Sequence, residues 1–159
     1  MPLKIGGITV DGPKTKLLVI PRDGFDIAFK FVAVTDDSVF EALCPAPVTR
    51  KGMKKDVGMV ELTDDPGYLS QVQARGAKRE AWYVIQSLKP SQIEWETVKE
   101  SDPETWSNWR IDLKNAGFSI LEINTIYATF LETNMVTDEM LTEARNRFLA
   151  SQQAVPAKQ

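Results

Sequence analysis

Five carboxylates lie close together in the sequence and form its densest group of side chains able to do chemistry: Glu94, Glu96, Glu100, Asp102 and Glu104. Paired carboxylates can act as general acid and base, and a cluster of them can hold a hard metal ion. Alternatively, acidic side chains at helix starts cap the backbone and complement the helix dipole. Three of the five fall at expected helix starts, and the sequence has no Asp-x-Asp-x-Asp-Gly calcium loop. We therefore interpret the cluster as structural and predict neither a metal site nor a catalytic residue.

The amino-acid composition excludes several classes of catalytic and metal site. The chain of 159 residues contains no histidine, which excludes histidine bases, Ser-His and Cys-His nucleophiles and His-ligated metals. Its single cysteine, Cys44, permits neither an internal disulfide nor a multi-Cys zinc site, and no histidine is present to lower the pKa of its thiol. We expect a non-catalytic protein without a cofactor.

A basic run, Arg50, Lys51, Lys54 and Lys55, is the other candidate for ligand binding. It has the charge to contact phosphates or an acidic partner, but no aromatic residues interleave with it for base stacking. The formal net charge of −3 also disfavours a nucleic-acid binder. We interpret the run as a solvated loop and keep a nucleic-acid-associated regulator only as a remote alternative. No stretch approaches the roughly 18 apolar residues of a membrane span, and no signal-peptide core is present, so a cytoplasmic location is expected.

The spacing of apolar residues changes along the chain, from the pattern of strands in the first part to the pattern of helices in the second. Residues 3–10, 16–20 and 27–34 are rich in β-branched and aromatic residues, and we predict that they form a three-stranded antiparallel unit. Asp36, Asp37 and Ser38 can cap a brief helix that follows. From about residue 45 to 65 neither period holds, which indicates a connector.

Helical spacing begins after Asp65, which precedes Pro66 as an N-cap precedes a first-turn proline. Further helix starts are predicted at Ser91, at Asp102, at Ser119 and at Thr137. The predicted fold class is therefore α+β, with a small N-terminal antiparallel β-sheet followed by a compact multi-helix domain. Its parts are a β-rich subdomain over 1–44, a connector over 45–65, a helical domain over 66–151 and a flexible tail over 152–159.

Motifs across residues 43–150 resemble those of tail assembly chaperones and related small tail proteins of long-tailed bacteriophages. Rare tryptophans with fixed neighbours carry the resemblance, in Glu94-Trp95-Glu96 and in Asp102-Pro103-Glu104-Thr105-Trp106. It continues through Ala116-Gly117-Phe118-Ser119 to Glu143-Ala144-Arg145 and Phe148-Leu149, and upstream it includes Cys44-Pro45-Ala46-Pro47 and Asp64-Asp65-Pro66-Gly67-Tyr68.

The resemblance implies a non-catalytic chaperone in the host cytoplasm that binds the tape measure protein and helps to recruit tail tube subunits. A minor tail protein that stays in the virion is the alternative. Short amphipathic helices can share apolar surface with a helical partner or with copies of the same chain. We place the partner-binding surface on the last two helices, where methionines add adaptable apolar side chains; its candidate residues are Phe130, Met135, Val136 and Met140. Phe130 has a second interpretation as a core residue.

Overall fold

The computed structural model describes residues 2–49, 51–55 and 57–154, and it has the predicted α+β fold class. The chain opens with two separate hairpins: β1 (Leu3–Ile5) pairs with β2 (Ile8–Val10), and β3 (Thr15–Arg22) pairs with β4 (Phe25–Val32). The predicted three-stranded unit is wrong, because the segment expected as its first strand bends back on itself. Gly6 and Gly7 form that bend with φ angles of 58° and 81°, and a two-residue turn with two positive φ angles is a favoured hairpin closure.

A short helix, α1 (Ser38–Leu43), follows β4 as predicted, and a third hairpin follows it. Its strands are β5 (Lys51–Lys54) and β6 (Gly58–Glu61), paired with Met53 opposite Met59. The hairpin lies inside the segment predicted as a connector. Arg50, one of the four residues of the basic run, lies outside the described residues.

The helical half consists of α2 (Pro66–Ser87), η1 (Lys89–Ser91), η2 (Pro103–Asn108), α3 (Trp109–Asn115), α4 (Ile120–Asn134) and α5 (Asp138–Ala154). The predicted caps at Asp65 and Ser119 are confirmed: the Asp65 carboxylate accepts from the Tyr68 amide at 3.1 Å. Ser119 and Glu122 form a reciprocal capping box with distances of 3.1 and 2.9 Å.

The helix predicted to start at Ser91 is absent, because the Ser91 side chain binds the backbone of β4 instead of capping a helix. The Ser91 hydroxyl accepts from the Lys30 amide at 2.7 Å and donates to the Lys30 carbonyl at 2.8 Å. Gln92 then takes a left-handed conformation with φ of 54°, which ends η1 and turns the chain away. Residues 93–102 run without a helix as a result.

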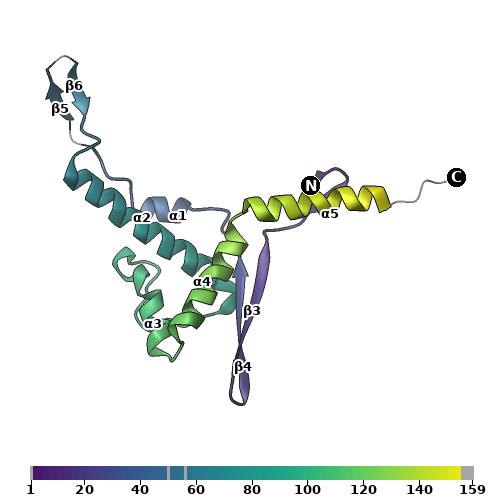
Figure 1. Ribbon diagram of the computed structural model, residues 1–159. Coiled ribbons are helices and arrows are strands. Elements are labelled where there is room, and N and C mark those ends of the chain that lie inside the picture. Colours follow the sequence, from purple (N-terminus) through teal and green to yellow (C-terminus); the bar gives the residue numbers. More distant parts are fainter. Residues whose placement is uncertain (1, 50, 56, 155–159) are drawn as a thin grey trace.

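One apolar core joins the β-rich and helical halves. Phe29 and Phe31 of β4 and Phe40 of α1 belong to the same buried cluster as Trp82, Val84 and Trp106. The Phe40 ring lies 5.9 Å from both Trp82 and Trp106, centroid to centroid. In Figure 1, α4 lies beside β3–β4 on one side and α2 on the other.

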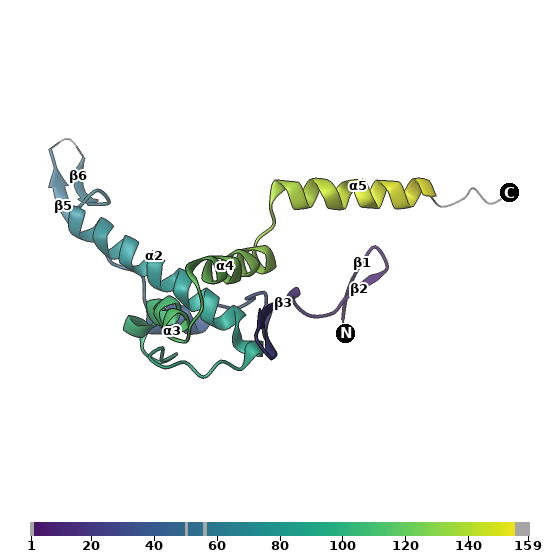
Figure 2. The same ribbon diagram turned by 60° about the horizontal axis from the view of Figure 1, so that its bottom comes forward.

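Three parts of the chain extend away from this body in both ribbon views: hairpin β1–β2, hairpin β5–β6 and helix α5 (Figures 1 and 2). Each of these projecting elements carries large apolar side chains in solvent; they are Leu3, Ile5, Ile8, Val10, Met53, Met59, Leu141, Phe148 and Leu149. Exposed apolar side chains gathered on one element can mark a site of interaction.

Candidate partner-binding site

The four predicted partner-binding residues lie at the end of α4 and the start of α5, but they differ in accessibility. Met135 and Val136 are 54% and 66% exposed in the link between the two helices, and Met140 is half-buried in the first turn of α5. Phe130 is only 5% exposed and belongs to the core, where its ring stacks 5.7 Å from Tyr127. Phe130 is therefore a core residue. Only one edge of its ring is open to a partner.

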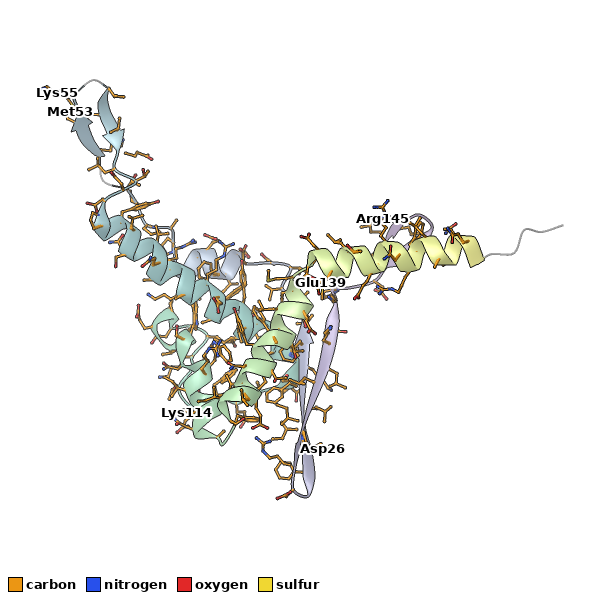
Figure 3. The ribbon with its side chains drawn as sticks, in the orientation of Figure 1. Asp26, Met53, Lys55, Lys114, Glu139 and Arg145 are labelled. Carbon is orange, nitrogen blue, oxygen red and sulfur yellow. The ribbon has the colours of Figure 1, made fainter. Side chains whose placement is uncertain are left out.

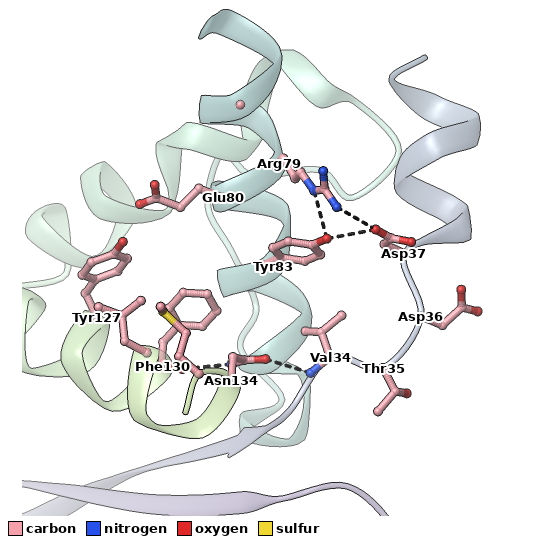
Figure 4. Close-up of a pocket in the computed structure, with 13 residues that line it drawn as sticks. Val34, Thr35, Asp36, Asp37, Arg79, Glu80, Tyr83, Tyr127, Phe130 and Asn134 are labelled. Atoms are coloured by element: carbon pink, nitrogen blue, oxygen red, sulfur yellow. Dashed lines mark hydrogen bonds and ion pairs between the residues drawn. The ribbon is translucent and has the colours of Figure 1, made fainter. Parts of the chain in front are cut away.

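That edge opens into a groove of about 630 Å³, here called the junction groove, between α2, α4 and the link from β4 to α1 (Figure 4). Phe130 and Met135 line it, whereas Val136 and Met140 do not. Its apolar surface comes mainly from Val34, Tyr127, Phe130, Leu131 and Met135.

A hydrogen-bonded triad forms the polar wall of the junction groove. Arg79 of α2 donates to the Tyr83 hydroxyl at 2.9 Å and to the Asp37 carboxylate at 3.2 Å, and the Tyr83 hydroxyl donates to Asp37 at 2.9 Å (Figure 4). Burial, the main cause, raises the pKa of Tyr83. The triad ties the β4–α1 link to the middle of α2 and fixes one side of the groove.

Asn134 closes one end of the groove from α4. Its side-chain oxygen accepts from the Val34 amide at 2.8 Å, and its amide group donates to the Phe130 carbonyl and to Ser87. The buried Ser87 hydroxyl donates a hydrogen bond to the Val32 carbonyl at 2.8 Å. A chain of polar contacts thus holds β4, α2 and α4 together beside the groove.

On the opposite side, Tyr127 faces Glu80 of α2. Burial, followed by a hydrogen bond with the Glu80 side chain, raises the pKa of Tyr127. The Arg110 guanidinium lies 5.0 Å from the centre of the Tyr127 ring and 4.5 Å from that of Trp109. The charged groups of the groove are therefore already engaged by neighbours, and its free surface is mostly apolar.

A second groove of about 420 Å³ lies between β4, residues 91–96 and the end of α3. Its floor is apolar and aromatic, from Ile27, Phe29, Ile93, Trp95, Leu113 and Phe118, and Glu94 and Glu96 stand at its rim. We call it the acidic groove. Asp112 lies at its base and accepts from the Thr97 amide at 2.9 Å and the Thr97 hydroxyl at 2.6 Å. Burial opposes ionisation of Asp112, but these bonds together lower the pKa of its carboxyl group.

The structure separates the five carboxylates that the sequence places together. Asp102 caps η2 by accepting from the Glu104 amide at 3.1 Å, Glu104 pairs with Lys78 at 2.6 Å, and Glu100 pairs with Lys89 at 3.2 Å. Glu94 and Glu96 make no ion pair among the residues that the structure describes. The capping interpretation holds for Asp102, but it fails for Glu94, because no helix starts at Ser91.

The other predicted features lie apart from both grooves. Within residues 2–49, 51–55 and 57–154, no group of acidic, histidine or cysteine side chains is arranged to hold a metal ion. No helix in this described part is long and apolar enough to cross a membrane. Cys44 is half-buried, and the Arg75 guanidinium donates to its backbone carbonyl at 2.9 Å.

Sequence reasoning missed the Arg79–Tyr83–Asp37 triad and both grooves, since each assembles residues that are distant along the chain. Arg79 and Tyr83 are four residues apart on one predicted helix, which is a usable signal, but nothing local pairs them with Asp37. Comparison of the chain with protein-family models, with curated protein sequences and with solved structures finds no match.

Proposed function

We propose that this protein is a non-catalytic tail assembly chaperone of a long-tailed bacteriophage. It acts in the host cytoplasm, where it binds the tape measure protein and helps to recruit tail tube subunits. The sequence motifs described above support the phage assignment. The structural observation that carries the binding role is helix α5, which stands away from the body with residues 141–153 all exposed.

Most helical stability in proteins comes from packing of an apolar face, which α5 does not obtain from the body of its own chain. Helix α5 has such a face: Met140, Leu141, Ala144 and Phe148 follow helical spacing and lie along one stripe. Phe148 is 61% exposed, and no element of the described chain covers it. A long helical partner, such as a tape measure protein, would bury this stripe by helix-to-helix packing.

The exposed link residues Met135 and Val136 continue the stripe toward the junction groove, which Met135 also lines. Flexible methionine side chains suit a surface that must accept varied segments of a long helical partner. The proposed binding surface thus runs from the junction groove across the link and along α5. Phe130 supports it from beneath, so a charged residue at that position would test folding rather than binding.

Co-purification with the tape measure protein tests the proposal. Leu141→Asp combined with Phe148→Asp should abolish recovery of a co-expressed tape measure protein, because both carboxylates fall on the apolar stripe. The matched control is Asn146→Asp combined with Ala150→Asp, which adds the same charge to the opposite face of α5. Equal recovery of the tape measure protein with both variants would refute the assignment of α5.

The two hairpins β1–β2 and β5–β6 favour the alternative of a minor tail protein retained in the virion. Each is a two-stranded sheet with unpaired outer edges, and such edges can add to the sheet of a neighbouring subunit. Mass spectrometry of purified particles separates the two roles. The chaperone is absent from finished particles, whereas a tail component is present in fixed amount.

A further inference from the structure

Two charged residues of opposite sign border the apolar stripe of α5 on the same side. Asp138 lies three residues before Leu141, and Arg145 lies four residues after it, so both adjoin Leu141 on the helix surface. Because they are seven residues apart, they follow one line along the stripe. Both are exposed, and Figure 3 shows Arg145 on the part of α5 that stands clear of the body.

Neither of these two charges has an opposite charge to bind on its own helix. Side chains three or four positions apart are neighbours on a helix, and those positions around Asp138 and Arg145 carry no opposite charge. Glu143 and Arg147, by contrast, lie four residues apart and 4.0 Å from each other. Among the residues that the structure describes, Asp138 and Arg145 make no ion pair. A partner that covers the stripe can therefore also neutralise both.

An antiparallel second copy of α5 has the matching charges in the matching order. Antiparallel helices bring the same edge of their two stripes together, so Asp138 of each copy meets Arg145 of the other. The charges also select the register. A shift of the partner helix by seven residues in one direction sets Asp138 against Asp138, and in the other direction it sets Arg145 against Arg145. A parallel pair joins opposite edges of the stripe and places Arg145 beside Met140, where no charge is neutralised.

We propose that two copies of this protein pair through antiparallel α5 helices about a two-fold axis. Leu141 packs on Ala144 of the partner copy, and Phe148 lies over the start of the partner's helix. Asp138 and Arg145 form two symmetric ion pairs along one edge. The contact uses the same surface on both copies, so it closes as a dimer. The helices overlap for only about 18 Å, and the interface is of the small, reversible class.

The pair covers the stripe to which the proposed function assigns the tape measure protein. A helix engaged by a second copy is not available to another partner, so the two contacts compete. This competition rests on the proposed function, whereas the pairing itself does not. The dimer then keeps the apolar stripe out of water while no tape measure protein is bound.

Charge reversal on α5 tests the pairing in the purified chain, without any tape measure protein. In sedimentation velocity across a concentration series, the wild type should show a monomer–dimer equilibrium. Asp138→Arg sets arginine against arginine at both ion pairs, and Arg145→Asp sets aspartate against aspartate. Each should weaken dimerisation about tenfold or more. Glu139→Arg is the matched control, because it makes the same charge change in the same helix turn but on the opposite face. It should dimerise as the wild type does.

An equimolar mixture of Asp138→Arg and Arg145→Asp provides the decisive measurement. In a mixed dimer both contacts join an arginine to an aspartate, so dimers should return, as they should in the chain that carries both substitutions. A monomeric wild type, undiminished dimers in either single variant, or no recovery in the mixture would overturn the proposal. Co-purification separates this result from the proposed function. A monomeric chain that recovers the tape measure protein refutes the pairing alone, and a dimer that does not recover it refutes the proposed function alone.

Discussion

At the residue scale, single polar side chains fasten elements that the apolar core alone would leave loosely placed. Glu122 is the clearest case, because one carboxylate performs two tasks. It caps α4 through the Ser119 amide, and it binds Arg22 of β3 through two contacts of 2.6 and 3.0 Å. Helix start and strand end are thereby fixed to each other.

These contacts make part of the stability dependent on pH. Hydrogen bonds from Arg22, and next from the Ser119 amide, lower the pKa of Glu122 from 4.5 to about 2. A depressed pKa in the folded state means that the contribution is complete above the unfolded pKa and is lost as pH falls through the folded value. Wild type should therefore be more stable than Glu122→Gln at pH 7, and the difference should shrink between about pH 4.5 and pH 2. Urea unfolding at a series of pH values measures it.

The control for this prediction is Glu139→Gln on α5, which removes an exposed carboxylate without an ion pair among the described residues. Its stability should follow that of wild type across the series. A difference between wild type and Glu122→Gln that stays constant down to pH 2 would show that the Arg22 and Ser119 contacts do not depend on the charge of Glu122.

At the element scale, prediction from sequence succeeded where the decisive contacts are local. The caps at Asp65 and Ser119 each involve residues three apart, and the buried positions of α2 follow helical spacing. Prediction from sequence failed where a local pattern is compatible with two structures. Ser91 has the spacing of a capping box but binds the backbone of β4, and the segment 3–10 has strand composition but contains a Gly6-Gly7 turn. Both grooves depend on packing between distant elements, which no local pattern encodes.

Helix α5 and the body should behave as independent elements. A chain ending at Val136 lacks the whole helix but loses no buried core residue. Its urea midpoint should therefore remain within error of that of the full chain, while recovery of a co-expressed tape measure protein should be lost. A midpoint that falls clearly on truncation would show that α5 packs on the body in solution and is not held ready for a partner.

At the scale of the whole molecule, a body with one shared apolar core carries three projecting elements, β1–β2, β5–β6 and α5. Aromatic residues from four elements form the centre of the body. Phe29 and Phe31 come from β4, Phe40 comes from α1, and tryptophans come from α2 and η2. The β-rich part and the helical part thus differ in secondary structure, but they share one core. Projections on such a body suit a protein whose apolar surface is completed by other chains.

A shared core predicts a single unfolding transition for both halves. Phe31 is 1% exposed on β4, and its replacement by alanine leaves a cavity in the cluster that also contains Trp82 and Trp106. Phe31→Ala should lower the free energy of unfolding by about 3–5 kcal/mol. Tryptophan fluorescence reports only the helical half, since all four tryptophans lie beyond residue 80, whereas far-ultraviolet circular dichroism reports the whole backbone. The two signals should shift together to a lower urea midpoint, because a strand substitution that loosens the core must also release the tryptophans. A fluorescence transition that stays at the wild-type midpoint would mean that the helical half folds without the strands.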